Sequence, residues 1–202
     1  DAMMAIWIDR PIAMLRYAAC VAALEMQQEV SKFNDSSKLG SLPTRIGINE
    51  GSINLMCIRS AGSLFYNPFG DALNTASRIE GVNKYLKTRI LATNAIVDGL
   101  TDIIYRPVGI FRLIGKEKPT ALVEIIGVGK ISTHPNYQCY EKFSEGLKLF
   151  QQGQWKQAET IFESILNRYG SDGPTQFYLA HAQQYQQLEP SNWDGTVVLE
   201  SK

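Results

Sequence analysis

Apolar side chains recur most regularly between Phe65 and Lys87, in the stretch FYNPFGDALNTASRIEGVNKYLK, and the rest of the chain is organised around it. Asp71 follows a turn and is predicted to cap a helix, because its carboxylate can accept hydrogen bonds from free N–H groups at the helix start. Asn74 and Arg78 lie four residues apart and project together from the polar face, where such pairs are usually solvated. The buried face is predicted at Ala72, Ala76, Ile79, Val82 or Asn83, and Leu86.

The residues before this helix predict one further helix and three strands. Residues 1–8 (DAMMAIWI) are apolar almost throughout, which is typical of a strand buried on both faces. Residues 11–33 have the periodicity of an amphipathic helix. The runs 44–49 and 52–58 predict two strands joined in a hairpin at Glu50 and Gly51, followed by a loop over 59–65.

Strands and helices continue after the central helix. The pattern predicts a strand over 88–93, a short helix over 94–100, and strands over 103–114 and 121–126. A tight turn, Gly115-Lys116-Glu117-Lys118-Pro119, separates the last two. Because the hairpins imply mixed strand pairing, the fold class is predicted to be α+β.

The chain changes character from Tyr137 onward, where it becomes rich in Gln and helical in pattern. The spacing of small and large residues at Gly146, Leu149, Ala158 and Phe162 resembles a tetratricopeptide repeat. A third helix over 174–187 makes about one and a half repeats, too few to stand alone, so this segment is predicted to pack on the first domain or on a partner. The Trp193-Asp194-Gly195 tail is predicted to be extended. The predicted domains are therefore 1–127, a linker over 128–136, and a helical segment over 137–202.

Composition narrows the possible functions. Twenty basic and twenty acidic residues balance, so nucleic acid is not an expected partner. No apolar run approaches the roughly 20 residues that cross a bilayer. The three cysteines have no metal or redox spacing, and an intracellular location fits them. With only two histidines, any metal would be held by carboxylates, which favours Mg²⁺ or Mn²⁺.

The central stretch resembles the signature helix of the class III nucleotide cyclases, whose usual form is close to YTxxGDxVNxAxRxEGxNK. The matching residues are Tyr66, Gly70, Asp71, Asn74, Ala76, Arg78, Glu80, Gly81, Asn83 and Lys84. The segment RIGIN from Arg45, followed by Gly51, and the Gly115 to Pro119 turn resemble the family's RIGINxG and GKxxP segments. The resemblance covers Asp1 to about Gly127.

The resemblance implies a ferredoxin-like sheet and an activity, the conversion of ATP into 3′,5′-cyclic AMP and pyrophosphate. In the family the residue matching Arg78 stabilises the transition state, and the one matching Asn74 holds the ribose. Lys116 is then expected to bind the nucleotide phosphates, and Asn67 to read the base. Asp1 matches a metal-binding aspartate, and it is one of two that hold two Mg²⁺ or Mn²⁺ ions in the family.

The resemblance also implies a homodimer with composite active sites. The second metal aspartate and a base-reading lysine belong to a strand that is expected upstream, so this chain alone is expected to be weak or inactive. A cytoplasmic domain attached to the inner membrane through an upstream region is implied in the same way, and the helical segment is a candidate contact for a protein partner.

Three alternatives stay open on the sequence. Asn67 stands where adenylate cyclases usually have Asp or Thr, and because an amide can donate or accept, it could read guanine as well as adenine. ATP is favoured on family frequency. A cyclase-like module that binds nucleotide or a partner without catalysis is the second alternative, and a repeat-based adaptor, which explains only the last third of the chain, is the third.

Overall fold

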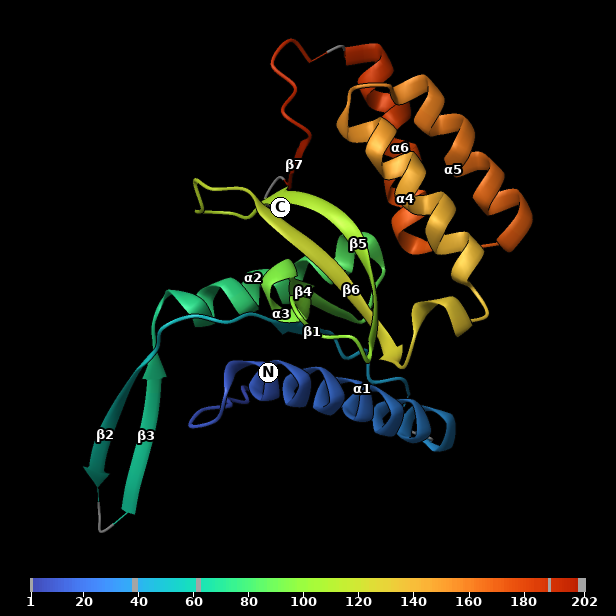
Figure 1. Ribbon diagram of the computed structural model, residues 1–202. Coiled ribbons are helices and arrows are strands. Elements are labelled where there is room, and N and C mark those ends of the chain that lie inside the picture. Colours follow the sequence, from blue (N-terminus) through green and yellow to red (C-terminus); the bar gives the residue numbers. More distant parts are fainter. Residues whose placement is uncertain (1, 38–39, 61–62, 189, 200–202) are drawn as a thin grey trace.

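The structure, a computed structural model, describes residues 2–37, 40–60, 63–188 and 190–199. Figure 1 shows a central sheet, a hairpin that projects from it, and a group of helices built from the last third of the chain. The helices are α1 (Ile12–Ser36), α2 (Asp71–Leu86), α3 (Asn94–Val97), α4 (Tyr137–Gln151), α5 (Trp155–Tyr169) and α6 (Gly173–Leu188), with a 3-10 turn at Ile131–Thr133. The strands are β1 (Ile46–Ile48), β2 (Asn54–Ser60), β3 (Ser63–Phe69), β4 (Ile90–Thr93), β5 (Ile103–Arg112), β6 (Thr120–Val128) and β7 (Thr196–Val198).

The main sheet has five strands in the order β1-β4-β6-β5-β7. The β1–β4 and β5–β7 pairs are parallel, whereas β6 runs antiparallel to both β4 and β5. Helices cover the sheet and connect its strands, so the predicted α+β class is confirmed.

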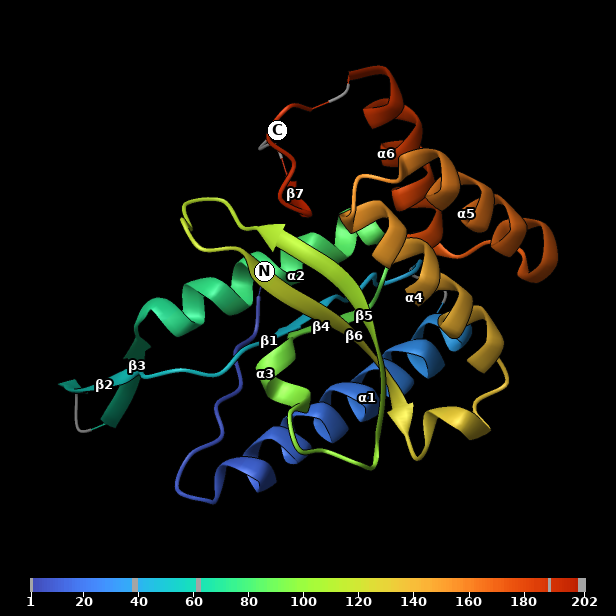
Figure 2. The same ribbon diagram turned by 45° about the horizontal axis from the view of Figure 1, so that its top comes forward.

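Helices lie on both faces of this sheet (Figures 1 and 2). α1 and α3 pack on one face through a cluster that includes Ala19, Cys20 and Ala23. α2 and α4–α6 pack on the other face. Successive residues of β4 divide between the two sides, because Leu91 belongs to the second cluster and Ala92 to the first.

The last three helices share one hydrophobic core with α2 and the sheet. Phe143, Phe162 and Tyr178 are buried together with Phe111 of β5. The extended tail is confirmed: Trp193 packs edge-on against Phe150, with its Nε1–H donating to the carbonyl of Gln151. β7 then adds to the edge of β5. The helical segment thus packs on the first domain, while its likeness to tetratricopeptide repeats stays a prediction.

One predicted strand and one predicted strand pairing are wrong. Residues 2–8 form no strand and are exposed, with Met3 80% and Met4 58% accessible, because no described strand lies beside them to pair with. The strand predicted over 44–49 is shortened to β1, and the one predicted over 52–58 is shifted to β2, and the two do not form a hairpin with each other. β1 pairs with β4, and β2 pairs with β3, so the residues predicted as a loop over 59–65 lie largely in the β2–β3 hairpin.

The long helix α1 lies at its predicted position and is buried along one side. Ala19, Cys20 and Ala23 are buried, but Ile12 is 53% exposed. Among the described residues, no helix combines the length and the apolar character needed to cross a membrane.

Candidate functional site

The site is built around the first half of α2, whose sequence explains how the helix begins. Gly70 precedes it with φ +152, a backbone conformation that side chains rarely adopt. Asp71 is the first helical residue rather than the cap, and no side chain caps this end. The predicted inner face is confirmed in its main positions, since Ile79, Val82 and Leu86 are buried. The outer face therefore carries the polar residues of the motif toward solvent.

Several residues of the signature stretch serve to hold α2 on β1. A Cβ added to Gly47 would lie 2.2 Å from the carbonyl oxygen of Ala76, so the helix crosses the strand where only glycine fits. Asn83 is fully buried; its Nδ2 donates to the carbonyl of Ile46 at 3.0 Å, and its Oδ1 accepts from Thr88 at 2.9 Å. Asn83 is thus a structural residue of the motif, since its amide forms its hydrogen bonds with residues inside the fold.

The turn between β5 and β6 meets the outer face of α2. Gly115 has φ +69, and a Cβ added there would lie 3.1 Å from the Nη2 of Arg78. The backbone N–H of Lys116 donates to the carbonyl of Leu113 at 2.9 Å and tightens the turn. The Lys116 ammonium forms an ion pair with the carboxylate of Asp71. Strand, turn and helix thereby bring together residues that are far apart in the sequence.

Three of the five predicted site residues share this place. Arg78 lies against Gly115, Lys116 reaches the start of α2, and Asn74 lies on the same helix face one turn before Arg78. Asn67 does not join them, because it lies in β3 opposite Met56 and is exposed. Asp1 lies outside the described residues, so its metal role stays a prediction.

Solvent-facing donors with no partner among the described residues lie on this face. In the described part of the chain, the side chains of Asn74 and Arg78 form no hydrogen bond or ion pair. Arg78 and Lys116 supply two positive charges against the single carboxylate of Asp71, and the N-terminal end of α2 adds its partial positive charge. A bound polyanion with hydroxyl groups would complement these donors.

Metal ligands are a different matter. The described residues contain no group of three or more His, Cys, Asp and Glu side chains that could hold a metal ion. Asp71 is the carboxylate at the site, and its charge is already matched by Lys116. The ligands that the resemblance implies, Asp1 and an upstream aspartate, lie outside the described residues, so the metal site stays a prediction.

The roles of two residues at the site, Asp71 and Gly115, are not predicted from the sequence. Asp71 was expected to cap the helix, but its carboxylate instead pairs with Lys116, and no local pattern announces a contact across 45 positions. Gly115 was recognised only as part of a turn. A glycine in this turn is consistent with the positive φ of Gly115. The approach of Gly115 to Arg78, however, depends on the tertiary fold.

Comparison with known proteins decides the family. Residues 2–125 match the family described as Adenylate and Guanylate cyclase catalytic domain. The chain belongs to this family. The matched range includes α2, the β5–β6 turn and all the described residues of the site, while α4–α6 and β7 lie beyond it.

Relatives of this cyclase domain include Adenylate cyclase 1 of Rhizobium meliloti, which is 34% identical over 63% of the chain and 20% of the relative. The Adenylate cyclase of Anabaena cylindrica is 32% identical over 50% of the chain and 21% of the relative. The "Adenylate cyclase, terminal-differentiation specific" of Dictyostelium discoideum is 26% identical over 89% of the chain and 9% of the relative. The chain thus spans about a fifth or less of these curated relatives.

A solved structure is also similar. The adenylyl cyclase CyaB from P. aeruginosa matches 57% of this chain and 58% of its own chain, with a TM-score of 0.42 and 17% identity.

Proposed function

We propose that this cyclase domain converts ATP into 3′,5′-cyclic AMP and pyrophosphate. The observation that carries the proposal is the cluster of donors on α2 and the β5–β6 turn. Within the described residues Asn74 and Arg78 have no side-chain partner, and Lys116 is paired with the exposed carboxylate of Asp71. Matched relatives named as adenylate cyclases support ATP as the nucleotide. Asn67 is the residue proposed to read the base.

The residues of the chain would divide the work of an in-line attack by the ribose 3′-hydroxyl on the α-phosphorus. The planar guanidinium of Arg78 suits the charge that develops on the phosphoryl oxygens in the transition state. Asn74, one turn away, would orient the ribose by a hydrogen bond. Lys116 would leave Asp71 and bind the phosphates as a point charge.

Metal ions enter the proposal on the resemblance alone. Mg²⁺ or Mn²⁺ would neutralise charge on the attacking and leaving oxygens, and Asp1 is the proposed ligand. Asn74, Arg78 and Lys116 would contribute positioning and charge stabilisation beside these ions.

A homodimer with composite sites is the proposed assembly. The β2–β3 hairpin projects from the rest of the molecule in both views (Figures 1 and 2). It exposes apolar side chains at Leu55, Leu64 and Tyr66, which are 45%, 50% and 66% accessible. An exposed apolar arm of this kind supports a protein contact. Mixing an Arg78→Ala chain with an Asp1→Ala chain should restore about a quarter of the activity, since a composite dimer then keeps one intact site in about half of its copies.

The deciding experiment measures cyclic nucleotide production by the full-length protein, with Mn²⁺ and either ATP or GTP. Arg78→Ala is expected to lower the rate by at least about a hundredfold, as removal of a transition-state donor does. Arg168→Ala is the matched control, because Arg168 is an exposed arginine on α5 outside the site. Preference for GTP would replace the proposal with a guanylate cyclase. No product from either nucleotide, in a folded protein, would leave a binding module.

A further inference from the structure

The start of α6, together with Asp172 just before it, touches both elements that carry the proposed site. On one side Gly173 packs on the C-terminal end of α2, where an added Cβ would lie 2.1 Å from the carbonyl oxygen of Leu86. Lys87, which ends α2, donates from Nζ to the Oε1 of Gln176 at 3.0 Å. The helical segment therefore limits how far α2 can move along its axis.

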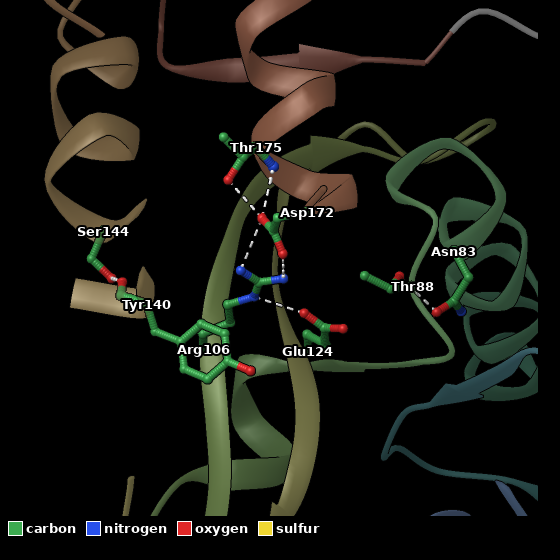
Figure 3. Close-up of polar contacts among 8 residues, drawn as sticks. All are labelled: Asn83, Thr88, Arg106, Glu124, Tyr140, Ser144, Asp172 and Thr175. Carbon is green, nitrogen blue, oxygen red and sulfur yellow. Dashed lines mark hydrogen bonds and ion pairs between the residues drawn. The ribbon is translucent and has the colours of Figure 1, made fainter. Parts of the chain in front are cut away.

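On the other side Asp172 holds β5 through a buried arginine (Figure 3). Arg106 is 3% exposed, and its guanidinium donates to both carboxylate oxygens of Asp172, at 2.7 Å from Nη2 and 3.1 Å from Nη1. Its Nε donates to Glu124 of β6 at 2.7 Å. The rings of Tyr140 and Phe143 of α4 lie 4.8 and 5.1 Å from the guanidinium carbon. Arg106 thus links the strand pair to α4 and to the loop before α6.

Asp172 is itself firmly held. Its Oδ2 accepts hydrogen bonds from the backbone N–H of Thr175 at 3.1 Å and from its hydroxyl at 2.6 Å, in the first turn of α6. Burial opposes its charge, but the hydrogen bonds from Arg106 and Thr175 outweigh this and lower the pKa of Asp172. One carboxylate therefore orders the start of α6 and fixes β5 at the same time.

Both held elements continue into the proposed site. α2 runs back from Leu86 to Arg78, a distance of roughly 12 Å at 1.5 Å per residue. β5 runs forward from Arg106 into the turn that carries Gly115 and Lys116. At that far end Gly115 lies against Arg78. A helix and a strand that are fixed together at one end therefore have a set separation at the other.

We propose that Asp172 is a positioning residue for the cyclase site, through which α4–α6 set the placement of α2 relative to the β5–β6 turn. Asp172 acts through Arg106 on the strand and through its neighbour Gly173 on the helix. The inference rests on the proposed function for its activity readout. The coupling between the helical segment and the site can also be measured without catalytic turnover.

The test compares Asp172→Asn with the intact full-length protein, using ATP and Mn²⁺ at a temperature where both are folded. The expected result is a kcat lower by about tenfold with KM within about twofold, because small misplacement of Arg78 affects the transition state more than ground-state binding. Asp194→Asn is the matched control. Asp194 also pairs with β5, through Arg112 at 3.2 Å, but this pair is exposed and should leave kcat unchanged.

Two further variants separate positioning from general weakening. Gly173→Ala should lower kcat in the same way, because the added methyl group displaces α6 from α2 while both partners of the Arg106–Asp172 ion pair are kept. This variant replaces Asp172→Asn in the test if Asp172→Asn fails to fold. Ile165→Val removes a methyl group from the buried side of α5 and should lower the melting temperature without changing kcat. Unchanged kcat in folded Asp172→Asn and Gly173→Ala, or an equal fall in Ile165→Val, would overturn the proposal.

Hydrogen exchange supplies a readout that needs no catalysis. Backbone amides of residues 113–119 and of the first half of α2 should exchange faster in Asp172→Asn than in Asp194→Asn. If the intact protein makes no cyclic nucleotide, the proposed function fails but this comparison still decides the coupling. Equal exchange in the two variants would refute it.

Discussion

Two arginines of this chain have opposite surroundings. Arg106, between β5 and α6, is buried, pairs with Glu124 and Asp172, and lies over two aromatic rings. Arg78, on the outer face of α2, is partly exposed and, within the described residues, has no hydrogen-bonding or ionic partner. The residue type is the same, but the N–H donors of Arg106 are hydrogen-bonded inside the fold, whereas those of Arg78 are available to a ligand.

This difference indicates which arginine holds the structure and which can serve a ligand. A guanidinium removed from water must be paired. Arg106 is paired with Glu124 of β6 and with Asp172 before α6, and it also lies over two aromatic rings of α4. At an exposed site the same group costs little to leave open, and it can then bind an anion with a planar pair of donors. Neighbouring Asn74 adds further donors without a partner among the described residues, and Lys116 adds a positive charge that is paired with the exposed Asp71.

The largest effect is expected from Arg106→Ala. It leaves two carboxylates partly buried without their cation, which should reduce the free energy of unfolding by about 3–5 kcal/mol. Denaturant unfolding checks this. Arg45→Ala, which removes the exposed ion pair with Glu80, should cost about 1 kcal/mol or less. Equal losses in the two variants would remove the distinction between buried and open arginines.

Arg78→Lys sharpens the other side of the comparison. The charge is kept but the planar fork is lost, so cyclic nucleotide production should fall by about a hundredfold while the melting temperature stays the same. Steady-state kinetics and thermal unfolding together check both parts. Full activity in the lysine variant would mean that Arg78 acts only as a positive charge.

Lys116→Ala should have a moderate effect confined to substrate binding. Loss of one charge on the phosphates is expected to raise KM by about tenfold with a smaller change in kcat. The KM for ATP, measured over a series of salt concentrations, checks this, and the dependence on salt should weaken in the variant. A large fall in kcat with constant KM would instead place Lys116 in the transition state.

The smallest effect is expected from Asp71→Asn. Asp71 competes with the nucleotide for Lys116, and an exposed pair contributes about 0.2–1 kcal/mol, so KM should fall by about two- to threefold. Glu117→Gln on the same turn is the control, since Glu117 is exposed and forms no ion pair in the described structure. A rise in KM would show that Asp71 assists binding rather than opposing it.

The central helix could be predicted because its information is local. The spacing of Ile79, Val82 and Leu86 defines one buried face, and the structure buries all three. Asn74 and Arg78 follow from the same periodicity, whatever their chemical roles. Pairing between distant strands could not be derived in this way. The prediction joined the runs 44–49 and 52–58 as neighbours in sequence, but β1 pairs with β4.

Contacts between distant side chains were also beyond the sequence. The pairing of Asp71 with Lys116 and that of Arg106 with Asp172 depend on where the β5–β6 strands meet α2 and α6. Neither pair has a spacing that periodicity detects. The strand predicted over 1–8 failed for a related reason, because an apolar run becomes a strand only where another strand offers hydrogen bonds.

The short strand β7 has a consequence for how the protein is made. β5 lies inside the sheet only once Thr196–Val198 have added to its edge. During synthesis β5 would therefore present an unpaired edge until Thr196–Val198 have left the ribosome. A nascent chain arrested before Trp193 should be prone to pair that edge with a neighbouring chain, and by covering the edge β7 would oppose such aggregation.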